Sequence, residues 1–385
     1  GKGGDITVTA RESINIRGIS PSSLPKPNNP FFRSALVTTT GGEGSAGNIK
    51  IVDTGIIKIE DGGVISASSL NQGDGGNIEI NADALEIIGV SPNGEFRNGV
   101  FSLTPGVDSF STAGNGVFSI TAGVDSSAKA GDITLNTRNL NLRDGAVLST
   151  QSTNEGEAGN ITIENDGRLQ LTGSSILTNS SESSGGSINI TAKDIRLFDN
   201  SDIRTDVNNG TGGGGNITLT ANTIIALDDS DILSFSADGK GGNINFNTAA
   251  FFSNPLYKPT PAIRDTRSVT SETYRQALNQ LNANEQVDVN ASGTVSGSIA
   301  GIPDTTFIQD SLTELPENQI DTNVLVASSC IARSNQQNGT FFVTGSGGLP
   351  QNPGDAPLSN YSTGKVQSIP ITSEKLPSSA TQNSW

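Results

Sequence analysis

Side-chain oxygens that could bind a cation recur at one position of a six-residue phrase, which first reads Gly3-Gly4-Asp5-Ile6-Thr7-Val8. Carboxylate and amide oxygens are the ligands that hard cations such as Ca²⁺ prefer. Each copy of the phrase supplies only one such residue, and most of them are uncharged, so we interpret the set as structural. Calcium binding is the alternative, and no other cofactor is expected. The eight copies place these residues at Asp5, Asn48, Asn77, Asp132, Asn160, Ser187, Asn216 and Asn243.

A second group of carboxylates, Asp228, Asp229 and Asp231, could support acid–base catalysis. Enzymes that hydrolyse polysaccharides need two convergent carboxylates for this purpose. The group occupies the place of Asp144-Gly145 and Asp61-Gly62 in other copies, however, and a turn accounts for it. The chain has no histidine and one cysteine, which excludes a His-based triad and a thiolate metal cage. We therefore predict no catalytic residues, no metal site and no enzymatic activity.

The composition narrows the choice of partners. The chain has 39 acidic and 23 basic residues and a net charge of −16, which argues against nucleic-acid binding.

Cys330 has no second cysteine to pair with, so it is either a buried small side chain or an anchoring thiol. Methionine is absent and the chain opens within a copy of the phrase, from which we expect a fragment or a processed product.

The spacing of the phrase predicts the fold. Its second residue falls at positions 4, 47, 76, 131, 159, 186, 215 and 242, and five of the seven spacings are 27 to 29 residues. The spacing of 55 is close to two periods, and the spacing of 43 equals one period with an insertion. A fixed period of this length is typical of a solenoid, in which each repeat packs only on its neighbours.

Each repeat contains three short alternating stretches, for example 187–191, 195–197 and 203–205. Alternation of polar and apolar residues favours strands with one buried face. The sequence therefore predicts an all-β protein, a right-handed parallel β-helix with about 27–29 residues and three short strands per coil. At the corner, Gly would supply positive φ, and the stacked Asx residues would hydrogen-bond along the axis within a buried turn.

Two interruptions divide the repeats of residues 1–250. Residues 17–35 hold four prolines and should leave the wall as a loop. Residues 88–128 fit an aromatic-bearing excursion plus one irregular coil. Loops of this kind carry binding in solenoids more often than the wall does, although phenylalanines more often pack than bind. The candidate contact residues are Phe96, Phe101, Phe110 and Phe118.

We expect the regular repeat to stop after residue 250. Residues 251–344 would hold a linker, a helix over 271–284 that caps the open end of the β-helix, and terminal irregular coils. Residues 287–302 alternate again and could form a further coil or two. Residues 345–385 are rich in Pro, Ser, Asn and Gly and should be an extended tail.

The chain resembles the cyanobacterial filamentous-haemagglutinin-like proteins, which are secreted β-helix proteins often described as adhesins or S-layer-like. The resemblance rests on the repeated Gly-Gly-Asn-Ile phrase with its Leu-x-Leu-x-Asp-Gly continuation over 1–250, and on the insertion at 89–94. A C-terminal signature covers 314–318, 325–330 and 341–350. This chain would correspond to the C-terminal part of such a protein.

The resemblance implies more than the residues do. Members of the family carry a signal peptide and a secretion domain that an outer-membrane transporter recognises, the two-partner route. It implies no catalytic residues.

We therefore predict a non-catalytic rod at the cell surface, associated with the outer membrane, that binds polysaccharide, protein or further copies of itself. A polysaccharide-active lyase or hydrolase on the same fold, and a subunit of an extracellular filament or surface layer, are the alternatives.

Overall fold

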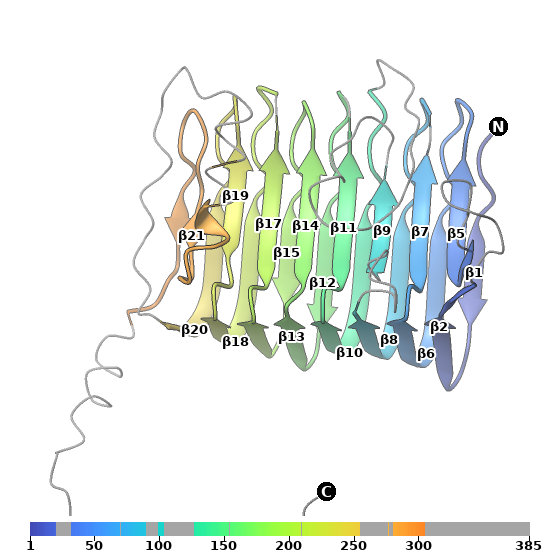
Figure 1. Cartoon of the computed structure of the whole chain (residues 1–385), viewed down its shortest axis with the longest axis horizontal. Helices are drawn as coiled ribbons and strands as arrows, with labels where there is room; N and C mark the ends of the chain where they lie inside the picture. The colour runs from blue at the N-terminus through green and yellow to red at the C-terminus, as the bar shows by residue number, and fades with distance from the viewer. Residues whose placement is uncertain are drawn as a thin grey trace, which may run out of the picture. The chain divides into compact units, whose positions relative to one another are not determined.

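The computed structural model describes residues 1–20, 32–69, 71–89, 99–103, 127–153, 155–208, 210–254, 276 and 280–304. All of them belong to the first of two compact units, which spans Gly1–Glu314. Within this unit the chain winds into successive coils, and equivalent strands of neighbouring coils pair in parallel (Figure 1). The predicted parallel β-helix is confirmed.

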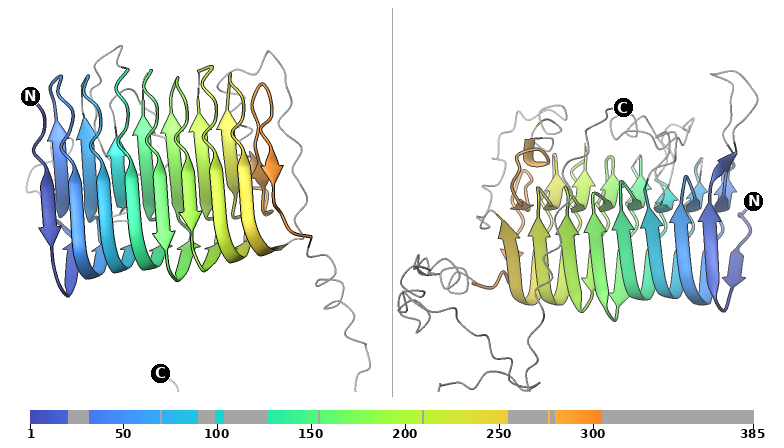
Figure 2. Two further views of the ribbon diagram at one scale, coloured as in Figure 1. Left: turned by 180° about the vertical axis from the view of Figure 1, so that it is seen from behind. Right: turned by 60° about the horizontal axis from the view of Figure 1, so that its bottom comes forward.

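Two sheets form the wall of the β-helix, and both run along its length (Figure 2). The smaller sheet has eight strands in the order β21-β19-β17-β14-β11-β9-β7-β5. It consists of β5 (Ala35–Thr40), β7 (Val64–Ser69), β9 (Gly99–Leu103), β11 (Val147–Ser152), β14 (Ser175–Ser180), β17 (Asp202–Val207), β19 (Ile232–Ser236) and β21 (Val289–Asn290). The larger sheet has twelve strands. They are β1 (Ile6–Thr9), β2 (Ser13–Arg17), β6 (Ile49–Glu60), β8 (Ile78–Ile88), β10 (Ile133–Arg143), β12 (Ile161–Asn165), β13 (Arg168–Thr172), β15 (Ile188–Thr191), β16 (Asp194–Phe198), β18 (Ile217–Leu227), β20 (Ile244–Asn254) and β22 (Ile299–Ala300).

Coils differ in how their first two strands are joined. In the coils of β12–β14 and β15–β17 three separate strands are present, as the sequence predicts. In β8, β10, β18 and β20 the first two strands run on as one strand of 11 residues. Both forms keep the same partners, since β10 pairs with β12 at one end and with β13 at the other.

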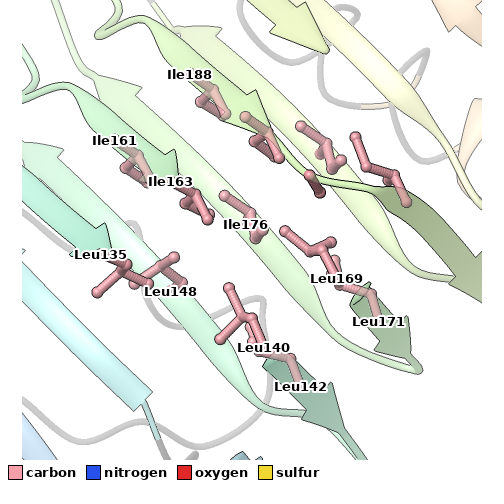
Figure 3. Packing of buried hydrophobic residues seen from close by; sticks show 14 of the residues in the cluster. Leu135, Leu140, Leu142, Leu148, Ile161, Ile163, Leu169, Leu171, Ile176 and Ile188 are labelled. Atoms are coloured by element: carbon pink, nitrogen blue, oxygen red, sulfur yellow. The ribbon is translucent and has the colours of Figure 1, made fainter. Parts of the chain in front are cut away.

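Inward-facing aliphatic side chains fill the interior. Residues in β12 alternate between buried and more exposed positions, and Ile161 and Ile163 are fully buried. Because the strands pair in register, Ile133, Ile161 and Ile188 stack on one another through three coils. Figure 3 shows Ile161 and Ile188 at equivalent positions of neighbouring coils. Each buried side chain of this size contributes about 1.5–3 kcal/mol through loss of its water-exposed surface.

The 55-residue spacing is one coil, not two. Strand β8 pairs directly with β10 along its length, with Ile78 opposite Ile133, and β9 lies between β7 and β11. The irregular coil predicted within 88–128 is therefore wrong, because an insertion of about one period imitates a coil in the spacing. Phe101 lies in β9, a strand of the wall, whereas Phe96, Phe110 and Phe118 lie outside the described residues.

The first insertion leaves the wall through a short antiparallel pair. β3 (Ile19–Ser20) pairs with β4 (Phe32–Arg33), and β5 begins at Ala35. The excursion beyond this pair, residues 21–31, lies outside the described residues. The predicted departure from the wall within 17–35 is thus observed at its base.

The repeat does not end at residue 250. β20 continues to Asn254, and a further coil is made by β21, which pairs with β19, and β22, which pairs with β20. This is the further coil that the alternation over 287–302 indicated. The helix predicted over 271–284 lies largely outside the described residues, although Gln276, Gln280 and Leu281 are helical. No helix among the described residues is long and apolar enough to cross a membrane.

Glycine is needed in the phrase for close approach and not for positive φ, so the sequence-based explanation is wrong. Positive φ occurs at the other corner, at Asp61-Gly62 and Asp144-Gly145. In the phrase, a Cβ added to Gly215 would lie 1.8 Å from the carbonyl oxygen of Gly186 in the preceding coil. The same backbone contact, at 1.8 to 2.0 Å, holds for Gly47, Gly76, Gly159, Gly186, Gly242 and Gly297.

We predict that Gly215→Ala lowers the free energy of unfolding by about 3 kcal/mol, since coils must move apart to admit the methyl group. Gly213→Ala is the matched control, because its Cβ would meet only the Lys240 carbonyl oxygen at an ordinary 3.6 Å. Thermal and urea unfolding of both variants measure the difference. Equal destabilisation of the two variants would contradict the close-approach explanation.

Candidate functional site

The Asx residues of the phrase form a hydrogen-bonded ladder on the surface. The side-chain oxygen of Asn48 accepts from the backbone N–H of Asn77 at 2.9 Å, and Asn77 accepts from that of Asp132 at 2.8 Å. Asp5, Asp132, Asn160, Asn216 and Asn243 make the equivalent bond to the next coil. These residues hydrogen-bond along the axis as expected, but the ladder is mostly exposed, so the expectation of a buried turn is wrong. Each of these oxygens accepts from a backbone N–H group, and Asn160 Nδ2 also donates to Asp132 Oδ1 at 3.1 Å.

The ladder continues one coil further than the sequence analysis placed it. Ser298 donates its backbone N–H to Asn243 Oδ1 at 3.0 Å, and it lies in a ninth copy that reads Ser296-Gly297-Ser298-Ile299. The degenerate spelling of this copy hid it. Among the described residues there is no group of three or more His, Cys, Asp or Glu side chains placed to hold a metal ion.

Buried threonine hydroxyls of the smaller sheet donate hydrogen bonds to glycine carbonyls of the repeated phrase, a feature that the sequence analysis missed. Thr150 Oγ1 donates to the carbonyl of Gly159 at 2.6 Å, and Thr178 donates to that of Gly186 at 2.7 Å. Thr38 and Thr205 do the same with Gly47 and Gly215. The signal was a threonine eight to ten residues before the second Gly of the phrase.

The other notable group is a column of three aspartates, Asp202, Asp231 and Asp288, in successive coils of the smaller sheet. Each directly precedes a paired residue, since Ile203 pairs with Ile232 and Ile232 pairs with Val289. Their exposed fractions are 6%, 0% and 3%. Asp231 Oδ1 accepts from the backbone N–H of Asp288 at 2.9 Å, whereas Asp231 Oδ2 has no hydrogen-bond partner. We call this set the aspartate column.

Burial disfavours ionisation in the column. It raises the pKa of Asp231 to about 9, with Asp202 and Asp288 adding to the rise and the Asp288 N–H opposing it. Burial also raises the pKa of Asp202 to about 6, against the attraction of Arg204. At pH 7 Asp231 is therefore protonated and Asp202 mostly ionised.

Two further carboxyls flank the column. The pKa of Asp206 is raised by burial, and Arg204, whose Nε lies 3.1 Å from Asp206 Oδ2, opposes the rise. The pKa of Asp229 is raised by burial and lowered in part by the N–H of Gln286. Asp202 Oδ2 also lies 3.0 Å from the Asn282 amide nitrogen once that amide is turned to face it.

The carboxylates Asp228, Asp229 and Asp231, which the sequence analysis assigned to a turn, are only partly brought together. Asp228 and Asp229 have φ of 57° and 60° and form the predicted turn, while Asp231 lies in the column. Sequence reasoning missed Asp202 and Asp288. The 29-residue interval from Asp202 to Asp231, one coil, was the available signal. Chemically, the arrangement can bind and release a proton.

A shallow polar depression of about 320 Å³ lies on the larger sheet, near the middle of strands β8 and β10. Its lining includes Asp83, Asn136, Arg138, Glu164 and Asp166. Arg138 Nη2 lies 3.3 Å from Asp83 Oδ1, and both side chains are largely exposed. Cys330 lies outside the described residues. Comparison of the chain with protein-family models, curated proteins and solved structures found no match.

We predict that Asn160→Ala destabilises the protein by about 1 kcal/mol, because it removes the acceptor of the Ser187 N–H, which water can only partly replace at the surface. Ser187→Ala is the control, because the described bonds of Ser187 are made by its backbone. Unfolding midpoints of the two variants test this. A loss in Ser187→Ala as large as that in Asn160→Ala would show that the ladder oxygen is not the cause.

Proposed function

We propose that this chain is part of a non-catalytic, secreted rod at the cell surface that works by presenting loops from a stiff wall. The observation that carries the proposal is that insertions leave the wall undisturbed. β8 and β10 keep their register from Ile78↔Ile133 to Ile88↔Arg143, although residues 89–132 lie between them in the chain. A scaffold of this kind permits loops to vary freely, and loops carry most binding functions.

The wall itself is suited to a mechanical role. Backbone hydrogen bonds tie each coil to the next, and the Asx ladder and the inward threonines add side-chain bonds at the corner. Because each coil contacts only its neighbours, the length of the rod can grow without redesign of a core. The resemblance to filamentous-haemagglutinin-like adhesins supports a location outside the cell, in association with the outer membrane. It also supports export through an outer-membrane transporter.

The partner in this proposal is a cell-surface polysaccharide or protein that contacts the loops, and copies of the rod can associate. We predict that replacing residues 104–126 by a short Gly-Ser linker abolishes attachment to cells or to polysaccharide. The β-sheet circular dichroism and the unfolding midpoint should stay unchanged, because β8, β9 and β10 take their partners from the wall. An equivalent replacement of 21–31, beyond the β3–β4 pair, tests the other loop. Full attachment by the double replacement would refute the loop proposal.

One observation favours an enzyme instead. A protonated carboxyl beside an ionised one is the arrangement that glycoside hydrolases use, and Asp231 and Asp202 provide it. Asp231 has no exposed surface, however, so a polysaccharide cannot reach its oxygens without opening the fold.

We therefore predict that incubation with acidic polysaccharides produces no new reducing ends and no unsaturated ends. Reducing-sugar assays and absorbance near the ultraviolet band of unsaturated uronates measure the two products. Release of either product, lost in Asp231→Asn, would replace the rod proposal by the enzyme.

A subunit of an extracellular filament or surface layer would use the same rod, with its C-terminal part docked to a partner. A crosslink through Cys330, seen as a mass increase of the non-reduced protein from its native source, would favour this role.

A further inference from the structure

The aspartate column lies where the last described coil, residues 284–304, meets the coil before it. Strand β21 pairs with β19 over two residues only, and β22 pairs with β20 over two. The isolated bridge Lys240↔Val295, the Asn243–Ser298 bond and five backbone hydrogen bonds add to these contacts. Because the paired strands are this short, side-chain contacts at the column contribute to the attachment of the coil.

In-register stacking brings like charges together in the column. Paired strands lie about 4.8 Å apart, so carboxyl groups at one position of successive coils are near neighbours. Like charges directly opposite each other on paired strands are destabilising. Asp231 lies in the middle, with Asp202 on one side and Asp288 on the other, and its Oδ2 is buried without a hydrogen-bond partner. A proton on this oxygen removes the central charge.

The surroundings offer little positive charge to replace that proton. Strand β17 presents Asp202, Arg204 and Asp206 on one face, and Arg204 pairs with Asp206. The turn before β19 adds the acidic residues Asp228 and Asp229. The segment that leads into β21 adds Glu285 and Asp288, together with the neutral Asn282 and Asn284. Among the described residues, Arg204 is the cation that acts on this group.

We propose that the aspartate column is a proton-dependent clasp, in which a proton on the buried Asp231 carboxyl keeps the last described coil docked on the β-helix. The inference does not depend on the proposed cell-surface function. It assigns to the column a conformational role, in which the last described coil is held most firmly in acidic medium and loosens progressively as the pH rises.

The direction of the pH effect follows from linkage. The unfolded pKa of an aspartate is about 3.9, and the folded pKa of Asp231 is raised to about 9. A group whose pKa is raised on folding contributes stability that is fully present below its unfolded pKa and is lost as pH rises through the folded value. Docking of the coil should therefore weaken progressively from about pH 4 up to about pH 9 and change little beyond it.

Hydrogen exchange of the full-length chain tests the clasp. We expect the protection of peptides covering 285–292 to fall by up to about tenfold per pH unit between pH 6 and pH 9, after correction for intrinsic exchange. Peptides covering 133–143, in β10, should keep their protection. Asp231→Asn mimics the protonated carboxyl and should remove the pH dependence of 285–292.

Asp228→Asn is the matched control, since Asp228 lies in the same turn, is exposed and has φ of 57°, which Asn tolerates. It should keep the parental pH dependence. If Asp231→Asn does not fold, Asp288→Asn removes a neighbouring charge and should reduce the slope. An unchanged slope in a folded Asp231→Asn or Asp288→Asn variant would overturn the proposal. So would protection by Ca²⁺ at pH 9 that Asp231→Asn abolishes, which would assign the column to a cation.

Discussion

Every coil of this protein lies directly on the coil before it, at the distance that backbone hydrogen bonds between strands set, and the rest of the structure depends on that contact. It is closest at the corner, where the carbonyl of one glycine approaches the Cα of the next within a distance that no Cβ can share. The second glycine of the phrase is therefore fixed by its neighbour in space. The phrase recurs because the contact recurs.

Because the coils stack in register, a residue type that recurs at one position of the repeat lies next to its copies in the neighbouring coils. At the first corner a side-chain oxygen meets a backbone N–H one coil away, so repetition of Asn or Asp adds one surface hydrogen bond per coil. In the aspartate column the same repetition places carboxyl beside carboxyl inside the protein, where burial penalises charge. Asp therefore stabilises the fold at the exposed ladder position and destabilises it, when ionised, at the buried column position. The surroundings of the position decide which effect prevails.

The sequence was sufficient to predict the β-helix and much of its core, because alternation and period both follow from stacking and neither depends on distant contacts. The spacing alone could not separate a coil from an insertion of the same length, and only the pairing of Ile78 with Ile133 does so. The phrase showed that glycine was needed but not whether conformation or proximity required it. The aspartate column was hidden for a related reason, since Asp288 is two periods along the chain from Asp231 but only one coil away.

Insertions occur where they cost the wall least. After each long insertion the next strand resumes the parallel pairing of the wall, as β10 does with β8, β22 with β20, and β5 with β7. A longer loop costs little extra closure entropy, whereas a residue added within a strand would turn the apolar side chains outward. Selection on such a chain can therefore change the loops and leave the wall intact. Since the last described coil is separated from the coil before it by one of these long insertions, its docking rests on local contacts, and in our proposal the buried aspartate column at that junction makes those contacts respond to protons.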